Sequence, residues 1–192
     1  DSFKRFYRDN YLHRLPKDRN ARILCVSCGP GYLVELLTGE GYSDVLGIDS
    51  FPDKIAFAEK RGLPCKVAFA FEFLEQATEP YDVIFCEQEL NHLTRQEIMD
   101  FLNLCRSHLR PGGTLACFAL NGANPITGAE ALAQNFDHFN TFTEYSMRQV
   151  LEHSGFVDID VFGLNLYVYY RNPVNYVAMF AAWALSAAFR AC

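Results

Sequence analysis

Two glycines and one aspartate in the first fifty residues have the spacing of a site for a nucleoside-containing ligand. Gly29 and Gly31 follow the apolar run Arg22–Ser27, and a helix-like segment begins directly after them. Glycine lets the backbone approach a ligand closely, and free amides at a helix start favour negative groups such as a carboxylate. Asp49 follows about twenty residues later, where a carboxylate can accept bonds from both hydroxyls of a ribose. An ordinary strand–helix turn is the alternative explanation of the glycines alone.

Two histidines have positions from which they could move a proton. His92 follows an apolar run near the middle of the chain, and His138 lies in a long segment without clear periodicity. A base of this type removes a proton from a hydroxyl that is being modified. The alternatives are that His92 bonds its own turn and that His138 is a plain surface residue. Glu87 and Glu89 bracket the turn before His92, where they either orient a ligand or are simply solvated.

The elements that must position these residues alternate between strand-like and helix-like segments. Short apolar runs separated by helical patterns predict a parallel sheet with helices on both faces, an α/β fold. Strands are predicted at Arg22–Ser27, Val45–Ile48, Cys65–Ala70, Tyr81–Cys86, Thr114–Leu120 and Phe156–Phe162, with residues 164–170 as a further antiparallel strand.

Helix boundaries are marked by capping residues, glycines and prolines. An N-terminal helix is predicted over residues 2–15, where aromatic and leucine side chains form one stripe before a proline. Ser50 with Asp53 and Thr94 with Glu97 both have the spacing of a capping box at a helix start. A further helix is predicted from Thr143 to a glycine at 155.

Length and composition limit the classes of function. The chain has 192 residues, half of them hydrophobic, and a net charge of −6. We expect one domain over residues 1–165 and an apolar helical appendage over 166–192. An acidic chain without a Lys/Arg cluster is a poor nucleic-acid binder. Seven scattered cysteines favour neither zinc nor disulfides, no metal ligands are predicted, and a reducing, cytoplasmic location is expected. Both ends are abrupt, so we expect a fragment.

Four segments in order resemble the class I methyltransferases that use S-adenosylmethionine (SAM). They are RILCVSCGPG at 22–31, GID at 47–49, YDVIF at 81–85 and LRPGGTL at 109–115. The resemblance runs from about Asn20 to Phe162. It implies a Rossmann-like fold with strand order 3-2-1-4-5-7-6, and SAM bound above the carboxyl ends of the strands.

The segment FTEYSMRQVLEHSGF at 142–156 resembles a subgroup associated with bacterial surface-glycan and lipid biosynthesis. This resemblance implies methyl transfer to a small-molecule or sugar-like acceptor, in the assembly of surface glycans.

The family's residue roles transfer to matching positions of this chain. The two glycines match those under the methionine part of SAM, Asp49 matches the ribose-binding acid, and His92 and His138 match histidines that face the acceptor. Phe69 or Phe71 is expected to stack on adenine. The predicted catalytic residues are His92 and His138, and the predicted cofactor-binding residues are Cys28, Gly29, Gly31, Asp49, Ser50, Phe69, Phe71 and Glu87.

Five positions depart from the family pattern and keep a second function open. Cys25 and Phe69 replace acids, Ser27 replaces a glycine, and Gln88 and Asn91 replace Asp and Glu. Each loss removes a hydrogen bond of about 0.5–1.5 kcal/mol. The alternative is therefore a degenerate methyltransferase fold that serves as a non-catalytic SAM-binding or partner subunit.

A nicotinamide-dependent oxidoreductase is a third class, which the sequence disfavours. Its fingerprint needs a third glycine where this chain has Val34.

The last segment, residues 174–191, is nearly all apolar. Three alternatives are open: packing on the domain or on a second copy in a homodimer, peripheral contact at the inner face of a membrane, and a membrane span. The first is favoured.

Overall fold

The computed structural model describes residues 2–124, 128–133, 135–164 and 174–190. Five parallel strands form one sheet in the order β3-β2-β1-β4-β5. Their bounds are β1 Arg22–Val26, β2 Asp44–Asp49, β3 Cys65–Val67, β4 Tyr81–Glu87 and β5 Leu109–Phe118. The order of the strands reverses between β1 and β4. A sheet of this kind has a ligand-binding crevice at that point, outside the carboxyl ends of the strands.

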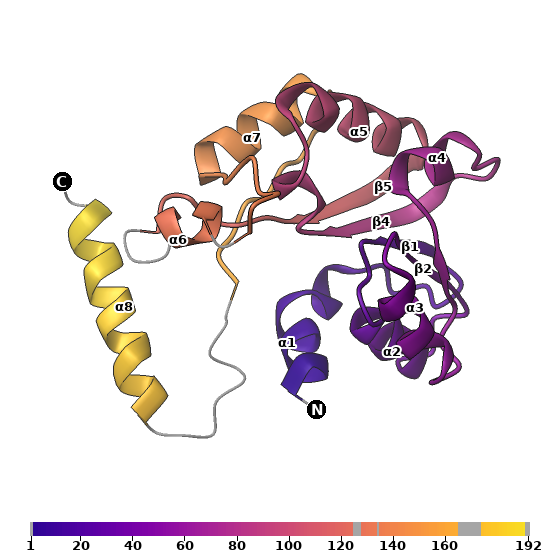
Figure 1. Cartoon of the computed structure of the whole chain (residues 1–192), viewed down its shortest axis with the longest axis horizontal. Coiled ribbons are helices and arrows are strands. Elements are labelled where there is room, and N and C mark those ends of the chain that lie inside the picture. The colour runs from indigo at the N-terminus through magenta and orange to yellow at the C-terminus, as the bar shows by residue number, and fades with distance from the viewer. Residues whose placement is uncertain (1, 125–127, 134, 165–173, 191–192) are drawn as a thin grey trace.

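Helices cover both faces of this sheet (Figure 1). On one face α1 (Ser2–Asn10), α2 (Tyr32–Gly39) and α3 (Pro52–Glu59) pack around Cys25 and Phe85. On the other, α4 (Ala70–Glu75), α5 (Arg95–Ser107) and α7 (Glu144–His153) pack around Leu24 and Ile84. Neighbouring strand residues are therefore buried on opposite faces, as expected of a parallel sheet. The predicted α/β fold is confirmed.

The N-terminal helix is shorter than predicted, and three short elements remain to be described. The predicted helix over residues 2–15 divides at Tyr11 into α1 and the 3-10 turn η1 (Leu12–Arg14). A second 3-10 turn, η2 (Glu89–Asn91), follows β4, and α6 (Gly128–Ala133) interrupts the long loop after β5.

Two strand predictions are wrong, and the fifth strand, predicted at Thr114–Leu120, instead covers Leu109–Phe118. The third strand ends at Val67 instead of residue 70, and Ala70 begins α4, which the sequence analysis did not predict. The segment 156–162 contains no strand, because Asp158 has a left-handed φ of 54° that breaks an extended run. The further strand predicted at 164–170 lies outside the described residues except for Leu164, which is not in a strand.

One capping prediction is confirmed and one is wrong. The side chains of Thr94 and Glu97 form a complete capping box at the start of α5. Ser50 does not cap α3, whose cap is Phe51 without a side-chain bond. The Asp49 carboxylate instead accepts a bond from the Phe51 amide, at 2.9 Å. The acid at the end of β2 therefore also holds the start of α3.

The C-terminal helix α8 (Val174–Arg190) lies apart from the sheet and its covering helices (Figure 1). Tyr176, Phe180 and Trp183 are each more than half exposed. That this helix packs on the domain or on a second copy stays a prediction. Among the described residues there is no helix with the length and hydropathy that crossing a bilayer requires.

Candidate functional site

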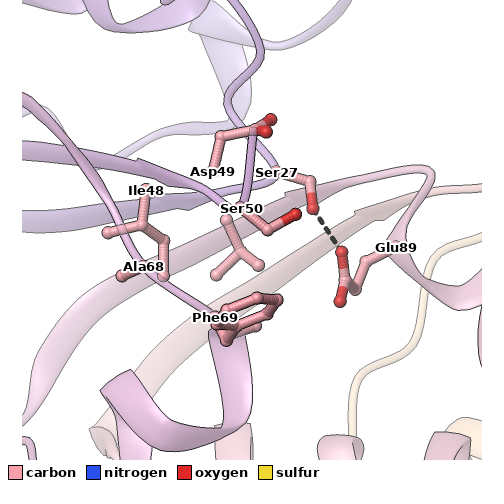
Figure 2. Close-up of a pocket in the computed structure, with 9 residues that line it drawn as sticks. Ser27, Ile48, Asp49, Ser50, Ala68, Phe69 and Glu89 are labelled. Atoms are coloured by element: carbon pink, nitrogen blue, oxygen red, sulfur yellow. Dashed lines mark hydrogen bonds between the residues drawn. The ribbon is translucent and has the colours of Figure 1, made fainter. Parts of the chain in front are cut away.

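A pocket of about 50 Å³ opens where the carboxyl ends of β1 and β2 meet the chain after β3 and β4. Small-molecule sites occupy roughly 300–1,000 Å³, so this pocket has room for only a small part of a ligand of that size. Figure 2 shows Ser27, Ser50, Phe69 and Glu89 gathered around it. The lining residues are Val26, Ser27, Ile48, Asp49, Ser50, Ala68, Phe69, Ala70 and Glu89.

Asp49 is held in a fixed orientation by the backbone around it. Its side chain is 4% exposed, Oδ2 accepts a bond from the Gly29 amide at 2.9 Å, and Oδ1 accepts one from the Phe51 amide at 2.9 Å. The Lys54 Nζ lies 3.8 Å from Oδ2. A carboxylate oxygen has two lone-pair sites, so each oxygen retains one for a ligand hydroxyl.

The two glycines of the first loop differ in what a side chain at each position would contact. Gly29 has a φ of 55°, and a Cβ built there would meet nothing within 4 Å. Gly31, with a φ of 79°, precedes α2, and a Cβ there would lie 2.9 Å from Leu63 Cδ1 and 3.3 Å from Ala58 Cβ. Gly31 is therefore required for the packing of α2 on the α3 side. Only Gly29 leaves its space open.

Ser27 and Glu89 form a hydrogen-bonded pair across the pocket. Ser27 has a φ of 54°, and its hydroxyl donates to the Glu89 carboxylate (Figure 2). Glu89 was weighed in the sequence analysis only as one of two acids beside a turn. The left-handed Gln88, with a φ of 56°, turns the chain after β4, so that Glu89 and not Glu87 reaches the pocket.

Glu87 lies on the other face of the sheet, beneath α1. The Tyr7 hydroxyl donates to its Oε2 at 2.7 Å. Burial raises the pKa of the Glu87 carboxyl to about 7, against the opposing effect of the Tyr7 bond. Glu87 does not line the pocket, so the structure separates it from Asp49 and its predicted cofactor role stays untested.

The two phenylalanines predicted near adenine are also separated. Phe69 caps α4 and lines the pocket with a ring that is 61% exposed. The Phe71 ring instead packs 5.6 Å from that of Phe101, in the core beneath α5. This placement favours Phe69 for stacking and gives Phe71 a packing role.

The cysteines near the loop are buried thiols. Burial raises the pKa of Cys25, and a hydrogen bond to Cys65 together with burial raises that of Cys28. A raised pKa leaves almost no thiolate, the nucleophilic form. Cys28 does not line the pocket, because its Sγ points toward Gly47.

The two predicted catalytic histidines, far apart in sequence, are in contact. Their ring centroids are 4.7 Å apart with edge-to-face geometry. His92 Nδ1 lies 3.1 Å from the Asp137 carboxylate, an arrangement that orients the imidazole. His138 is 7% exposed, so the surface alternative for this residue is wrong.

Asn91 holds the loop that brings His138 to His92. Its side chain is fully buried, donating from Nδ2 to the Asn140 carbonyl at 2.6 Å and accepting from the Leu120 amide at 3.2 Å. Its own carbonyl accepts from the Phe139 amide at 2.8 Å. Asn91, which stands where the family has a glutamate, therefore holds this loop in place. We call this set of hydrogen bonds the Asn91 clamp.

Replacing Asn91 with alanine is expected to destabilise the protein by about 2–3 kcal/mol, because buried partners lose their bonds. The loop over residues 121–142 should become more accessible to hydrogen exchange and to protease. Urea unfolding and exchange measurements check both effects, with the exposed Asn103→Ala on α5 as the matched control. Equal loop protection in the two variants would contradict the clamp.

Comparison with known proteins identifies the family of this chain. A family profile described as "Methyltransferase domain" matches residues 2–161. The chain is 28% identical over 182 residues to a ubiquinone biosynthesis O-methyltransferase of Cereibacter sphaeroides strain KD131, covering 86% of this chain and 68% of that protein. The human mitochondrial enzyme of the same name is 29% identical over 131 residues, covering 60% of this chain and 35% of its own.

Solved structures share the fold at lower identity. A SAM-dependent methyltransferase from Archaeoglobus fulgidus superposes with a TM-score of 0.66 at 20% identity, covering 86% of this chain and 79% of its own. Magnesium protoporphyrin IX methyltransferase from Synechocystis, solved with bound S-adenosylhomocysteine (SAH), gives 0.59 at 19% identity, covering 79% and 70%.

These findings confirm the predicted enzyme class and its cofactor, SAM, and they change the expected subgroup. The relatives named above are O-methyltransferases of ubiquinone biosynthesis, whereas the sequence analysis predicted a surface-glycan subgroup. With the profile matching most of its length, this chain belongs to the methyltransferase domain family.

Proposed function

We propose that the protein transfers a methyl group from SAM to a hydroxyl of a small organic acceptor. The observation that carries this proposal is Asp49, a buried carboxylate oriented by two backbone amides at the switch point of the sheet. The names of the relatives, O-methyltransferases of ubiquinone biosynthesis, support a hydroxyl acceptor. A sugar-like acceptor, expected from the segment 142–156, has no further support.

The residues of the pocket fit the adenosine part of SAM. The two remaining lone-pair sites of Asp49 match the two ribose hydroxyls. The exposed face of Phe69 offers a stacking surface for adenine in place of the acid that the family has there. The open space at Gly29, next to the start of α2, suits the amino-acid part of the cofactor.

When bound, SAM supplies a methyl group on a positively charged sulfur. The chain then has to align the acceptor oxygen with that methyl group and remove its proton. His92 is the proposed base. Asp137 orients its ring, and the ring of His138 is in edge-to-face contact with it. In this step the acceptor oxygen would take the methyl group that bound SAM supplies, and the hydroxyl proton would pass to His92.

Two measurements test this function. Calorimetry with SAM, SAH and NAD is expected to show binding of the first two only. Turnover is then measured with a panel of phenols, catechols and sugars, on which His92→Gln should lower kcat by about 100-fold and leave SAM affinity unchanged. The exposed His153→Gln is the matched control.

The outcomes separate the alternatives. SAM binding without turnover on any acceptor supports the non-catalytic alternative, in which the fold only binds SAM. Equal turnover by wild type and His92→Gln removes this histidine from the mechanism.

A further inference from the structure

A cluster of three metal-ligating side chains lies on the residue after η2 and on the long loop after β5. His92, Asp137 and His138 each offer one ligand atom, and these atoms all lie within 4.8 Å of one another. His92 Nδ1 lies 3.1 Å from Asp137 Oδ2. No metal site was predicted from the sequence, because 45 or more residues separate His92 from its two partners.

Within this cluster the protein fixes the position of His138, whereas the Asp137 side chain is free to turn. His138 is 7% exposed, and the Asn135 amide Nδ2 lies 3.2 Å from its Nε2. The Asn91 clamp fixes the chain just after it, at Asn140. The Asp137 side chain is 66% exposed, so its carboxylate can turn without repacking.

The donor set selects a class of ion. Two imidazole nitrogens and one carboxylate oxygen suit zinc, cobalt and related divalent transition metals, whereas magnesium and calcium prefer oxygen ligands alone. Ligands about 2.0–2.1 Å from a tetrahedral ion lie about 3.3 Å apart, close to the His92–Asp137 separation. The remaining separations between ligand atoms, up to 4.8 Å, have to shorten by on the order of 1–2 Å, which the partly exposed His92 and the exposed Asp137 can provide by turning toward the fixed His138.

We propose that His92, Asp137 and His138 bind one divalent transition-metal ion of the zinc class, leaving a fourth position for water or for an oxygen of a small molecule. Binding of the ion does not depend on the proposed function. Its consequence for catalysis does, because an ion on His92 Nδ1 leaves the ring proton on Nε2, the nitrogen that would act as the base. In the metal-loaded protein an ion-bound hydroxide would then remove the acceptor proton.

The test uses the whole chain without an affinity tag, after chelator treatment and under reducing conditions. Cobalt(II) alone is the probe, since tetrahedral coordination gives intense visible bands. Wild type is expected to take up one equivalent, and His138→Ala to bind about tenfold more weakly or worse. Asp137→Asn, an exposed position that does not risk the fold, should also weaken binding. The exposed His13→Ala and His153→Ala serve as controls.

Three results would overturn the proposal: no cobalt uptake by wild type, unchanged uptake by both ligand variants, or a sulfur-to-cobalt absorption band. The last would place the ion at the cysteines, of which the chain has seven. SAM calorimetry on the same samples keeps the two proposals apart. Cobalt uptake that needs His138 supports the metal site even where SAM fails to bind, and that failure counts only against the proposed function.

Discussion

Asp49→Ala is expected to weaken the binding of SAM and of SAH by a factor of about 10²–10⁴. The variant removes two hydrogen bonds from a carboxylate to ribose hydroxyls, each of about 1.5–3 kcal/mol because the acceptor is charged. SAM and SAH should lose affinity equally, since they share the ribose. Calorimetry at fixed salt measures both, and Asp53→Ala, an exposed acid in the first turn of α3, is the matched control.

Asp49 also holds Gly29 and Phe51, so a loss of affinity could come from a disturbed loop. Asp49→Asn separates the two causes, because its amide oxygen still accepts one backbone bond and the shape is kept. A SAH analogue without the 2′-hydroxyl completes the test. The analogue should bind wild type weakly and lose less on Asp49→Ala than SAH does. An equal loss for both ligands would mean that Asp49 acts through the loop and does not contact the ribose.

Local chemistry explains most of what the sequence predicted correctly. A strand buried on both faces is a continuous apolar run, so β1, β2 and β4 could be recognised without knowledge of their neighbours. The capping box of Thr94 and Glu97 closes within one helical turn and depends on nothing else. Asp49 could be placed at the pocket because it directly follows a strand-like run, and Phe69 because it matches the family position that follows the third strand.

Long-range contacts explain what the sequence could not predict. The segment 156–162 has strand-forming residues, yet a strand also needs a pairing partner. There, Val157 is 81% exposed, and Phe162 packs its ring 3.7 Å from the Arg14 guanidinium. The burial of His138 depends on Asn91, a residue 47 positions earlier that holds the loop over it. Neither contact leaves a local sequence signal.

The glycine loop has a packing requirement that the sequence did not reveal. A side chain at Gly31 would collide with Leu63, and the predicted role of Gly31 toward the ligand stays a prediction. Conversely, the serine in place of the family's first glycine adopts the left-handed φ that a glycine would, and uses its hydroxyl to hold Glu89. Substitutions that suggested a degenerate site from the sequence therefore have structural roles in this chain.

Glu87→Gln is expected to stabilise the protein at pH 8 by up to about 3 kcal/mol and to have little effect near pH 4.5. Burial raises the pKa of the folded Glu87 to about 7, above its ordinary value of 4.5, so the folded state binds the proton more tightly than the unfolded state does. The stability that this proton contributes is complete below pH 4.5 and is lost as the pH rises through 7. Urea unfolding at pH 4.5, 6 and 8 measures the difference.

Two further variants test whether burial beneath α1 is the cause. Tyr7→Phe removes the hydroxyl that stabilises the carboxylate, so the pKa of Glu87 should rise further and the loss of stability should extend to higher pH. Glu79→Gln, at an exposed position, should keep the pH dependence of wild type. A parallel dependence in wild type and Glu87→Gln would show that the carboxyl is solvated. The sequence analysis predicted that Glu87 binds SAM. If it does so at the positively charged part of SAM, Glu87→Gln should lower SAM affinity. The stabilisation at pH 8 should then reverse at saturating SAM, because the bound cation favours the ionised acid.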